Sequence, residues 1–559
     1  MTDAAAQTPP ADDWWRSAVV YQVYPRSFAD SDGDGIGDVN GIRARLPYLA
    51  DLGVDAIWIS PWYPSPLLDG GYDVSDYRGI NPEFGTLEDA DALIREAHEL
   101  GLRVLIDLVP NHCSWEHPWF KTALAAGRGS PERDRFWFRD GKGSDGSQPP
   151  TNWPAAFGGS AWQRIEDGQW YLHLFDISQP DFKWGNQEIV DEFDSILRFW
   201  FDRGVDGFRI DVADSMAKDP SLPDVPEHLS TPASGPERIE RGDKYPGHPT
   251  YDQPAVHDIH QHWRTVADSY ADTPEGPRVF VAEAWLSPAE RLAKYVRPNE
   301  LHSAFNFDAL RCPWDADQLR EVIDHTTENL WAVGAPATWV LSNHDTIRHR
   351  TRYGRDLIDA QAPAGAVGSD LEVGLRRARA AALLELALPG GAYVYQGDEL
   401  GLPEVEDLPE DVLDDPTWER SGHTVRGRDG CRVPIPWGGS EPPYEFGPGN
   451  GQPWLPQPAD WAPLTAEAQA GDPDSMLSLY KAALRIRKEH QALGEGRLEW
   501  DEETPKGVLS FTRHPGFRCV VNISTEPIDL PGDDSEVLLA SRPLADGKLP
   551  VDTTVWLRA

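Results

Sequence analysis

The sequence predicts an α/β protein built as a (β/α)8 TIM barrel, with an inserted subdomain after the third strand and an all-β domain at the carboxyl end. Three observations support this prediction. Short, almost continuously apolar segments recur between residues 18 and 397. Amphipathic helical patterns separate them, and two longer regions interrupt the alternation. Apolar strands that alternate with helices are typical of a parallel sheet covered on both faces.

The stretch from residue 86 to residue 109 shows the repeating unit. Thr86 is a candidate N-cap, and Gly101 is placed to end the helix that begins there. One face of that helix carries Ala90, Leu93, Ala97 and Leu100. The apolar run RVLIDLV (103–109) follows as a strand. The same order of helix, glycine and strand returns before GFRIDV (207–212), which predicts a second unit of the same kind.

Eight segments fit the strand pattern, and eight such units predict a closed barrel with insertions. The segments are AVVYQVYP (18–25), AIWIS (56–60), RVLIDLV (103–109), GFRIDVA (207–213), VFVAEAW (279–285), SAFNF (303–307), WVLSNHD (339–345) and GAYVYQG (391–397).

The chain divides into three predicted domains. We expect the barrel to occupy residues 14–112 and 178–493, and an inserted subdomain to occupy residues 113–177, where Trp, Gly and Pro are frequent and periodicity is weak. Residues 401–474 are acidic and rich in Pro, which predicts a second insertion that covers the barrel like a lid. Short alternating runs within residues 494–559 predict a small C-terminal β-sandwich-like domain.

The overall charge excludes several partners. The chain has 559 residues and a formal net charge of −41, which argues against nucleic acid or an anionic membrane surface as a partner, because both require basic protein surfaces. No stretch of 18 apolar residues is present, so no membrane span is expected. The N-terminal residues 1–15 lack the pattern of a signal peptide, and the four cysteines lack metal-ligand spacing. These features predict a cytoplasmic protein with free thiols.

Three predicted strands end in a carboxylate, namely Asp211, Glu283 and Asp345. An isolated buried charge costs several kcal/mol. Three carboxylates at the ends of buried strands therefore indicate a site that requires acids. The carboxyl ends of the strands of a (β/α)8 barrel meet at one face, where the active site lies. The three acids are therefore expected to surround one site. Cleavage of a glycosidic bond requires such a set, with one carboxylate as nucleophile and one carboxylic acid as proton donor.

The neighbours of these acids suggest their protonation states. Arg209 lies two residues before Asp211, on the same side of the strand, and is expected to keep that carboxylate ionised. Glu283 lies among apolar residues, which are expected to favour its protonated form. Each feature alone is more often structural than catalytic, but together they indicate an active site. His112 and His344 end two further strands at the same mouth.

At this point the chain resembles the α-amylase superfamily, glycoside hydrolase family 13, in its oligo-1,6-glucosidase and α-glucosidase branch. The resemblance begins near residue 14 and extends to the end of the chain. Its motifs are DLVPNH (107–112), QPDF (179–182), GFRIDVADSM (207–216), EAW (283–285) and NHD (343–345). The resemblance implies that Asp211 is the nucleophile, Glu283 the acid/base and Asp345 the stabiliser of the transition state.

The same resemblance implies the sugar-binding residues and a mechanism that retains the anomeric configuration. His112, Arg209 and His344 would contact the sugar that is cleaved. DGGYDVSDY (69–77) resembles the stretch that supplies a pocket-closing Asp and a stacking Tyr, here Asp69 and Tyr72. GRDGCRVPIPW (427–437) resembles the segment that supplies an Arg, here Arg432, to pair with Asp69. Such a pair would block the pocket behind the non-reducing sugar and make the enzyme exo-acting.

The acidic loop DSDGDGIGD (30–38) is a candidate metal site. Its acidic side chains at alternate positions resemble the start of an EF-hand, but Gly41 stands where an EF-hand requires Glu. The loop does match the calcium or magnesium loop of the same enzyme branch. The resemblance implies a structural Ca²⁺ or Mg²⁺, with no catalytic cofactor. The implied ligands are Asp30, Asp32, Asp34, the carbonyl of Ile36, and Asp38.

The predicted function is an exo-acting, retaining α-glucosidase that acts on short maltose- or isomaltose-type oligosaccharides, as a monomer or a small homo-oligomer. Val212, after the proposed nucleophile, resembles members that prefer α-1,6 linkages, while Lys183 departs from the usual residue. The alternative is an α-glucosyl transferase or isomerase of the trehalose- or isomaltulose-synthase type, which would use the same three acids. A catalytically inactive relative is disfavoured because all three acids are present.

Overall fold

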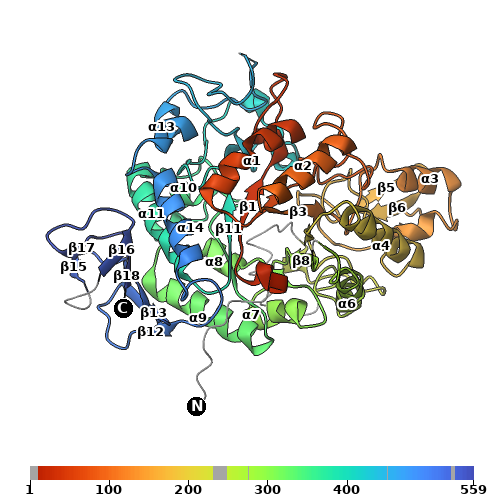
Figure 1. Ribbon diagram of the computed structural model, residues 1–559. Helices are drawn as coiled ribbons and strands as arrows, with labels where there is room; N and C mark the ends of the chain where they lie inside the picture. Colours follow the sequence, from red (N-terminus) through yellow and green to blue (C-terminus); the bar gives the residue numbers. More distant parts are fainter. Residues whose placement is uncertain (1–10, 231–247, 275, 450, 531–535, 559) are drawn as a thin grey trace.

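The computed structural model describes residues 11–230, 248–274, 276–449, 451–530 and 536–558 (Figure 1). Residues 1–10 lie outside the described residues. They make up most of the N-terminal segment (1–15) from which the sequence predicts that no signal peptide is present. Within the described part of the chain, no helix has both the length and the apolar character needed to cross a membrane.

Eight parallel strands form the predicted barrel. In the sheet their order is β10-β11-β1-β2-β3-β7-β8-β9. Between β9 and β10 the described residues form no ladder, so the barrel is nearly but not fully closed. The strands are β1 (Val19–Val23), β2 (Ala56–Ile59), β3 (Arg103–Leu108), β7 (Gly207–Ile210), β8 (Val279–Ala282), β9 (Ser303–Ala304), β10 (Thr338–Val340) and β11 (Gly391–Tyr395). Seven of them lie within segments that the sequence predicts to be strands, and β10 begins one residue before its predicted segment.

Helices pack around the outside of this sheet (Figure 1). The predicted cap at Thr86 is confirmed, since its hydroxyl accepts from the Asp89 N–H while the Asp89 carboxylate accepts from the Thr86 N–H. The longer helices are α1 (Val39–Leu52), α2 (Leu87–Glu99), α4 (Gln187–Phe201), α6 (Ala255–Asp268), α9 (Ala316–Ala332), α11 (Leu371–Ala387) and α14 (Met476–Glu489). Shorter helices are α7 (Ala289–Leu292), α8 (Phe307–Arg311) and α10 (His349–Tyr353).

The two-residue period of the strands decides which side chains enter the barrel. On β7, Phe208 and Ile210 belong to the large core between sheet and helices. Arg209 points the other way, and its guanidinium meets carboxylates from neighbouring strands inside the barrel. The rest of the interior is a separate apolar cluster that includes Trp58 and Leu105. The barrel is therefore apolar at depth and charged at its carboxyl end.

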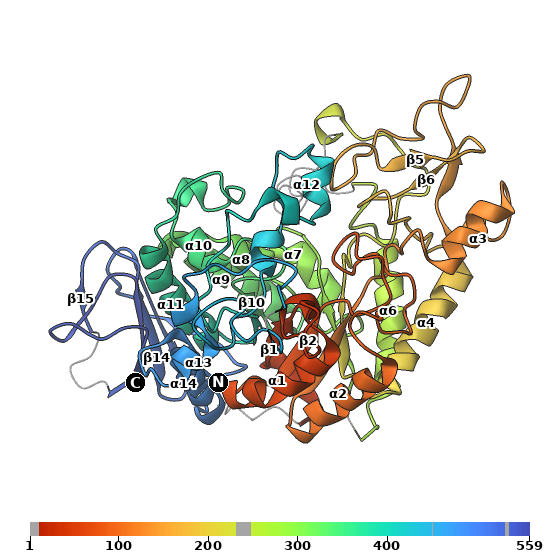
Figure 2. The ribbon, with the colours of Figure 1, turned by 90° about the horizontal axis from the view of Figure 1, so that it is seen from above.

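Two insertions rise from the carboxyl ends of the strands. After β3 come α3 (Pro118–Ala126) and a three-stranded antiparallel sheet of β4 (Phe138–Asp140), β6 (Gln169–Leu172) and β5 (Trp162–Arg164). After β11, residues 401–474 carry α12 (Pro416–Arg420) and α13 (Ala466–Ala470). Figure 2 shows α12 and the β5–β6 sheet on the same side of the barrel. Between them they flank the barrel mouth.

The C-terminal strands form a separate antiparallel sheet, on the side of the barrel away from the first insertion (Figure 1). Its strands, in order, are β12 (Glu499–Trp500), β13 (Val508–Arg513), β14 (Phe517–Asn522), β18 (Thr553–Arg558) and β16 (Glu536–Ala540). Two short strands, β15 (Ile528–Asp529) and β17 (Lys548–Leu549), pair beside it. The sheet is fixed to α11, because Trp556 donates to the Leu383 carbonyl and Thr554 to the Ala380 carbonyl. The exact domain boundaries stay predictions.

We predict that Gly207→Ala destabilises the barrel. A Cβ at Gly207 would lie 2.4 Å from the Val279 carbonyl oxygen, so β7 and β8 would have to move apart. Overpacking of this kind costs about 1–3 kcal/mol. Thermal unfolding followed by circular dichroism should show a lower Tm.

Gly185→Ala is the matched control, because nothing lies within 4 Å of its added Cβ and its backbone does not require glycine. Equal Tm values for the two variants would show that the contact between β7 and β8 does not limit stability.

Candidate functional site

A cavity of about 380 Å³ opens at the carboxyl ends of the barrel strands. Phe157 and Phe175 from the first insertion and Arg428 from the second line its upper part. Of the residues predicted from the sequence, Asp69, Tyr72, His112, Asp211, Glu283 and Asp345 line the cavity. Arg209, His344 and Arg432 lie directly behind that lining and are buried. The structure therefore brings all nine predicted residues to one place.

The guanidinium of Arg209 joins three carboxylates. Its Nη1 lies 2.7 Å from Asp107 Oδ1 and 2.6 Å from Asp211 Oδ1, while its Nη2 lies 2.7 Å from Glu283 Oε2. The side chain is 3% exposed, so these ion pairs are shielded from water. The acids come from the ends of β3, β7 and β8. One cation thus fixes the positions of acids from three neighbouring strands.

The protonation of this cluster differs from the sequence prediction. Burial raises the pKa of Asp211 well above its ordinary value, and the charges of Glu283 and Asp107 add to the effect, although Arg209 opposes it. Burial also raises the pKa of Asp107 to about 6. A single guanidinium cannot neutralise three buried carboxylates, so the cluster favours an additional proton in the ligand-free pocket. The expectation that Arg209 by itself keeps Asp211 ionised is therefore wrong for this state.

The surroundings of Glu283 are also more polar than the sequence suggests. The indole N–H of Trp285 donates to Oε1 at 2.7 Å, and the Val212 backbone N–H donates to Oε2 at 2.9 Å. Together with Arg209, these donors give Glu283 three polar partners. The expectation of an apolar setting for this acid is corrected, because Trp285 presents its polar edge to the carboxylate.

Val212, which directly follows Asp211, has a strained backbone with φ of 37°. A β-branched residue is rarely found in the left-handed region, and such strain costs about 1–3 kcal/mol. The strained turn directs the Val212 N–H toward Glu283 Oε2. This hydrogen bond joins the backbone directly after Asp211 to the side chain of Glu283. Strain of this kind is concentrated at functional sites.

Asp345 has cationic partners of its own. Its Oδ1 lies 3.0 Å from Arg428 Nη1 and 3.1 Å from Arg432 Nη2, and its Oδ2 lies 3.3 Å from His344 Nε2. Although burial opposes it, contact with the His344 ring and the positive charges of Arg428 and Arg432 lower the pKa of Asp345 below its usual range. Asp345 is thus the acid of the site that stays charged, in contrast to Asp211.

The structure corrects the predicted partner of Asp69. Arg428 Nη2, and not a nitrogen of Arg432, lies 2.7 Å from Asp69 Oδ1. Arg432 instead contacts Asp345 and donates from Nε to the His344 carbonyl. Both arginines lie in the stretch GRDGCRV (427–433), four residues apart, and the sequence does not show which of them faces the pocket. Arg428 and Gln179, which donates to Asp69 Oδ2 at 2.9 Å, are the residues that sequence reasoning missed.

The two histidines of the pocket are neutral because they are buried. Burial lowers the pKa of His112 to about 4 and that of His344 to about 3. The ring of His344 stacks on Tyr72 with an interplanar angle of 7°, and its Nε2 lies 2.7 Å from the Tyr72 hydroxyl. The Tyr72 hydroxyl also lies 3.1 Å from Asp107 Oδ2. These contacts hold Tyr72 in the wall of the pocket.

The loop at residues 30–38 brings three of its four predicted carboxylates together. Oxygen atoms of Asp30, Asp32 and Asp38 lie within 4.8 Å of one another, and Asp30 and Asp38 are buried. Asp34 stands outside this group, and its Oδ1 accepts from the Ile36 N–H. Three converging carboxylate oxygens fit the preference of Ca²⁺ or Mg²⁺ for oxygen ligands. These residues could therefore hold a metal.

Lys183, the other residue that departs from the family pattern, does not line the pocket. Its ammonium contacts Asp134 in the first insertion. The structure thus gives it a role in holding that insertion.

A parallel eight-stranded barrel with three acids at the carboxyl ends of β7, β8 and β10 defines the class of barrel-fold glycoside hydrolases. The family model "Alpha amylase, catalytic domain" matches residues 22–496. The chain belongs to this family, glycoside hydrolase family 13.

Several known proteins are similar to this chain over most of its length. A probable alpha-glucosidase of Rhizobium meliloti (strain 1021) is 39% identical over 535 residues, which cover 92% of this chain and 90% of that protein. An oligo-1,6-glucosidase of Parageobacillus thermoglucosidasius is 35% identical, with 91% and 90% covered. Among solved structures, the alpha-glucosyl transfer enzyme XgtA is 35% identical with a TM-score of 0.83, and 99% of each chain is covered. The trehalulose synthase MutB is 31% identical with a TM-score of 0.82, with 98% and 100% covered.

We predict that chelation lowers the stability of this protein more than it changes its chemistry. Removal of a cation bound at about a hundredfold excess over its Kd costs about 2.7 kcal/mol, or roughly 2 °C in Tm for a chain of this size. Treatment of the full-length protein with EDTA should lower Tm by that amount, and added Ca²⁺ or Mg²⁺ should restore it.

Asp30→Asn is the matched variant, because it removes one buried carboxylate charge from the loop. After EDTA treatment, its Tm should no longer rise when Ca²⁺ is added, in contrast to the wild type. A wild-type Tm that EDTA leaves unchanged would rule out the metal loop.

Proposed function

We propose that this protein is an exo-acting, retaining α-glucosidase that releases glucose from the non-reducing ends of short α-glucosides. The observation that carries the proposal is the ion pair between Asp69 and Arg428 at the cavity that also contains the three acids. Arg428 spans from Asp69 to Asp345, so a charged bridge stands where a longer glucan chain would otherwise continue. A pocket closed in this way admits the non-reducing end of a glucan chain and excludes the internal sugars of that chain.

In this mechanism Asp211 attacks the anomeric carbon while Glu283 gives a proton to the departing glycosidic oxygen. The C–O bond to the leaving group breaks as a glycosyl ester forms on Asp211. Glu283 then takes a proton from water, which hydrolyses the ester and releases glucose with its configuration retained. Asp211 must be deprotonated before it attacks. Asp345, kept charged by Arg428 and Arg432, would bind hydroxyls of the same sugar and stabilise its developing positive charge.

The linkage preference follows from the resemblance at Val212, which is typical of relatives that cleave α-1,6 bonds. Val212 lines the cavity and follows Asp211, so its side chain is placed to contact the leaving group. We therefore include isomaltose as well as maltose among the substrates.

An α-glucosyl transferase or isomerase is the second candidate. The observation that favours it is the apolar wall above the acids, formed in part by Phe157, Phe175 and Val425. In the second step, such a wall favours a sugar or an apolar molecule over water as the acceptor. The glucosyl group would then be transferred to that acceptor. XgtA and MutB, which are similar in structure, carry names of transfer and isomerisation reactions. The same three acids would serve both outcomes.

We predict that purified protein releases glucose from maltose or isomaltose and barely degrades soluble starch. Chromatography of the products over time, with maltose, isomaltose, sucrose and starch as separate substrates, measures this directly. The ratio of initial rates on isomaltose and maltose gives the linkage preference. Asp211→Asn is the control, and it should be folded and inactive because it cannot form the ester.

New disaccharides or longer oligosaccharides that precede glucose would assign the protein to the transferase or isomerase group. Retained turnover in Asp211→Asn would overturn the assignment of the nucleophile.

We predict that Arg428→Lys weakens the closure of the pocket. A lysine ammonium cannot bond Asp69, Asp345 and Asp415 at once, as the Arg428 guanidinium does. Loss of a buried charged hydrogen bond costs about 2 kcal/mol or more, or roughly thirtyfold. The value of kcat/KM for maltose should fall at least tenfold on that basis, while the rate on starch relative to maltose should rise.

Arg420→Lys is the matched control, since Arg420 lies in the same insertion but pairs with Asp176. If both variants keep the wild-type ratio of maltose to starch activity, the bridge does not determine chain-end specificity.

A further inference from the structure

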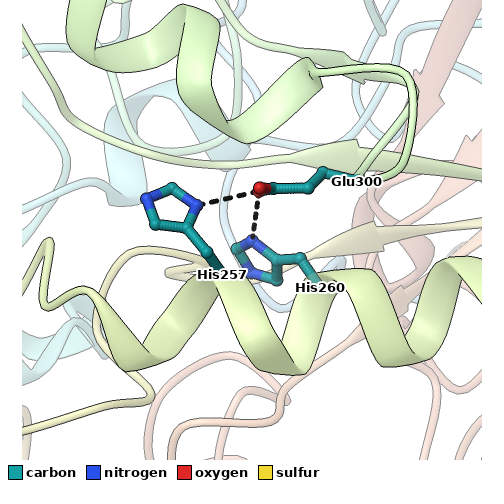
Figure 3. A group of neighbouring side chains, drawn as sticks. All are labelled: His257, His260 and Glu300. Carbon is teal, nitrogen blue, oxygen red and sulfur yellow. Dashed lines mark hydrogen bonds and ion pairs between the residues drawn. The ribbon is translucent and has the colours of Figure 1, made fainter.

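A second cluster of chemically active side chains lies on α6, outside the pocket. His257 and His260 stand one turn apart on this helix, and Glu300 approaches from the segment before β9 (Figure 3). In Figure 3 both imidazoles point toward the Glu300 carboxylate. None of the three residues lines the catalytic cavity. The cluster therefore requires an explanation separate from sugar cleavage.

The distances in this cluster match those of a metal site before its ion is bound. The Nδ1 atoms of His257 and His260 lie 2.8 Å and 3.9 Å from the same oxygen, Glu300 Oε2. All three ligand atoms lie within 4.8 Å of one another. A tetrahedral Zn²⁺ with bonds of about 2.0–2.1 Å separates its ligand atoms by about 3.3 Å. Shifts of roughly half an ångström would bring both nitrogens to this separation from Glu300 Oε2.

His260 is the independent observation that points to a ligand. Its side chain is fully buried, and neither ring nitrogen makes a hydrogen bond of normal geometry within the described residues. The Ala213 carbonyl faces the ring, but the contact does not have the geometry of a hydrogen bond. The ion pair with Glu300 gives His257 a polar partner. His260 stays buried without a hydrogen bond of normal geometry, which costs about 1–3 kcal/mol. A bound metal gives a partner to Nδ1.

Glu300 is oriented as a metal-ligating carboxylate usually is. Arg297 and Gln261 both donate to Oε1, so Oε2 is left for the two histidines. A charged carboxylate and a neutral imidazole are the forms that bind metals, and carboxylates held by further hydrogen bonds are typical of metal sites.

We propose that His257, His260 and Glu300 form a structural Zn²⁺ site. His257 is 15% exposed, so its side gives access to the ion and to a water molecule as fourth ligand. The bound ion would tie α6 to the segment before β9. Because Ala213 faces His260 and lies two residues after Asp211, the tie also supports the end of β7.

The test is metal binding by the full-length protein. The protein is first stripped with a chelator and then kept in excess CaCl2, which occupies the loop at residues 30–38. Titration with ZnCl2 in a calorimeter should show one tight site, and CoCl2 should give the visible absorption of a tetrahedral site with imidazole ligands. His257→Gln and Glu300→Gln should each weaken Zn²⁺ binding at least a hundredfold.

His262→Gln is the matched control, because His262 lies on the same helix but pairs with Asp194 at the surface. It should bind Zn²⁺ as the wild type does. His257→Gln, at a partly exposed position, keeps the test decisive if Glu300→Gln does not fold. Identical Zn²⁺ titrations for wild type and His257→Gln, or the absence of a tight site in the wild type, would overturn the proposal.

Discussion

The shared guanidinium of Arg209 is the interaction on which the rest of the site depends. Three carboxylates at the ends of neighbouring strands would repel one another strongly in a buried setting. Arg209 bonds all three, and removal of one partner from such a cluster costs about 3–5 kcal/mol. Because Arg209 lies on β7 between the strands that supply Asp107 and Glu283, the parallel order of the barrel sets the spacing of the acids. Fold and chemistry therefore depend on the same side chain.

Around this cluster the structure divides the acids into two electrostatic settings. Asp211 and Asp107 share one cation and favour a proton, whereas Asp345 has Arg428 and Arg432 and stays charged. In the proposed double displacement Asp211 must lose this proton before it attacks, Glu283 exchanges a proton with the leaving group and water, and Asp345 keeps its charge throughout. The two insertions complete the arrangement, since Arg428 comes from one and the aromatic wall from the other. The barrel supplies the reactive groups, and the insertions decide which molecules reach them.

Most of the fold was predictable from particular local signals. The apolar runs that became the eight barrel strands, the capping box at Thr86 and the weak periodicity of residues 113–177 are all visible in short windows of sequence. The acids at strand ends were predictable for the same reason, because the carboxyl ends of parallel strands must meet. The partner of Asp69 was not predictable, since Arg428 and Arg432 lie in one irregular segment whose path no periodicity fixes. The polar setting of Glu283 was missed because Trp285 has both an apolar face and an N–H.

The sequence by itself determined the barrel, its two insertions, the family and the acids, because hydrophobic periodicity and strand-end motifs act over a few residues. Only the tertiary structure decided which arginine closes the pocket and how three acids share one cation. It also decided that His257 and His260 of α6 meet Glu300, about forty residues further along the chain. These outcomes depend on distances between side chains that are remote in sequence. Such distances, and the desolvation that accompanies them, arise only when the strands and insertions pack together.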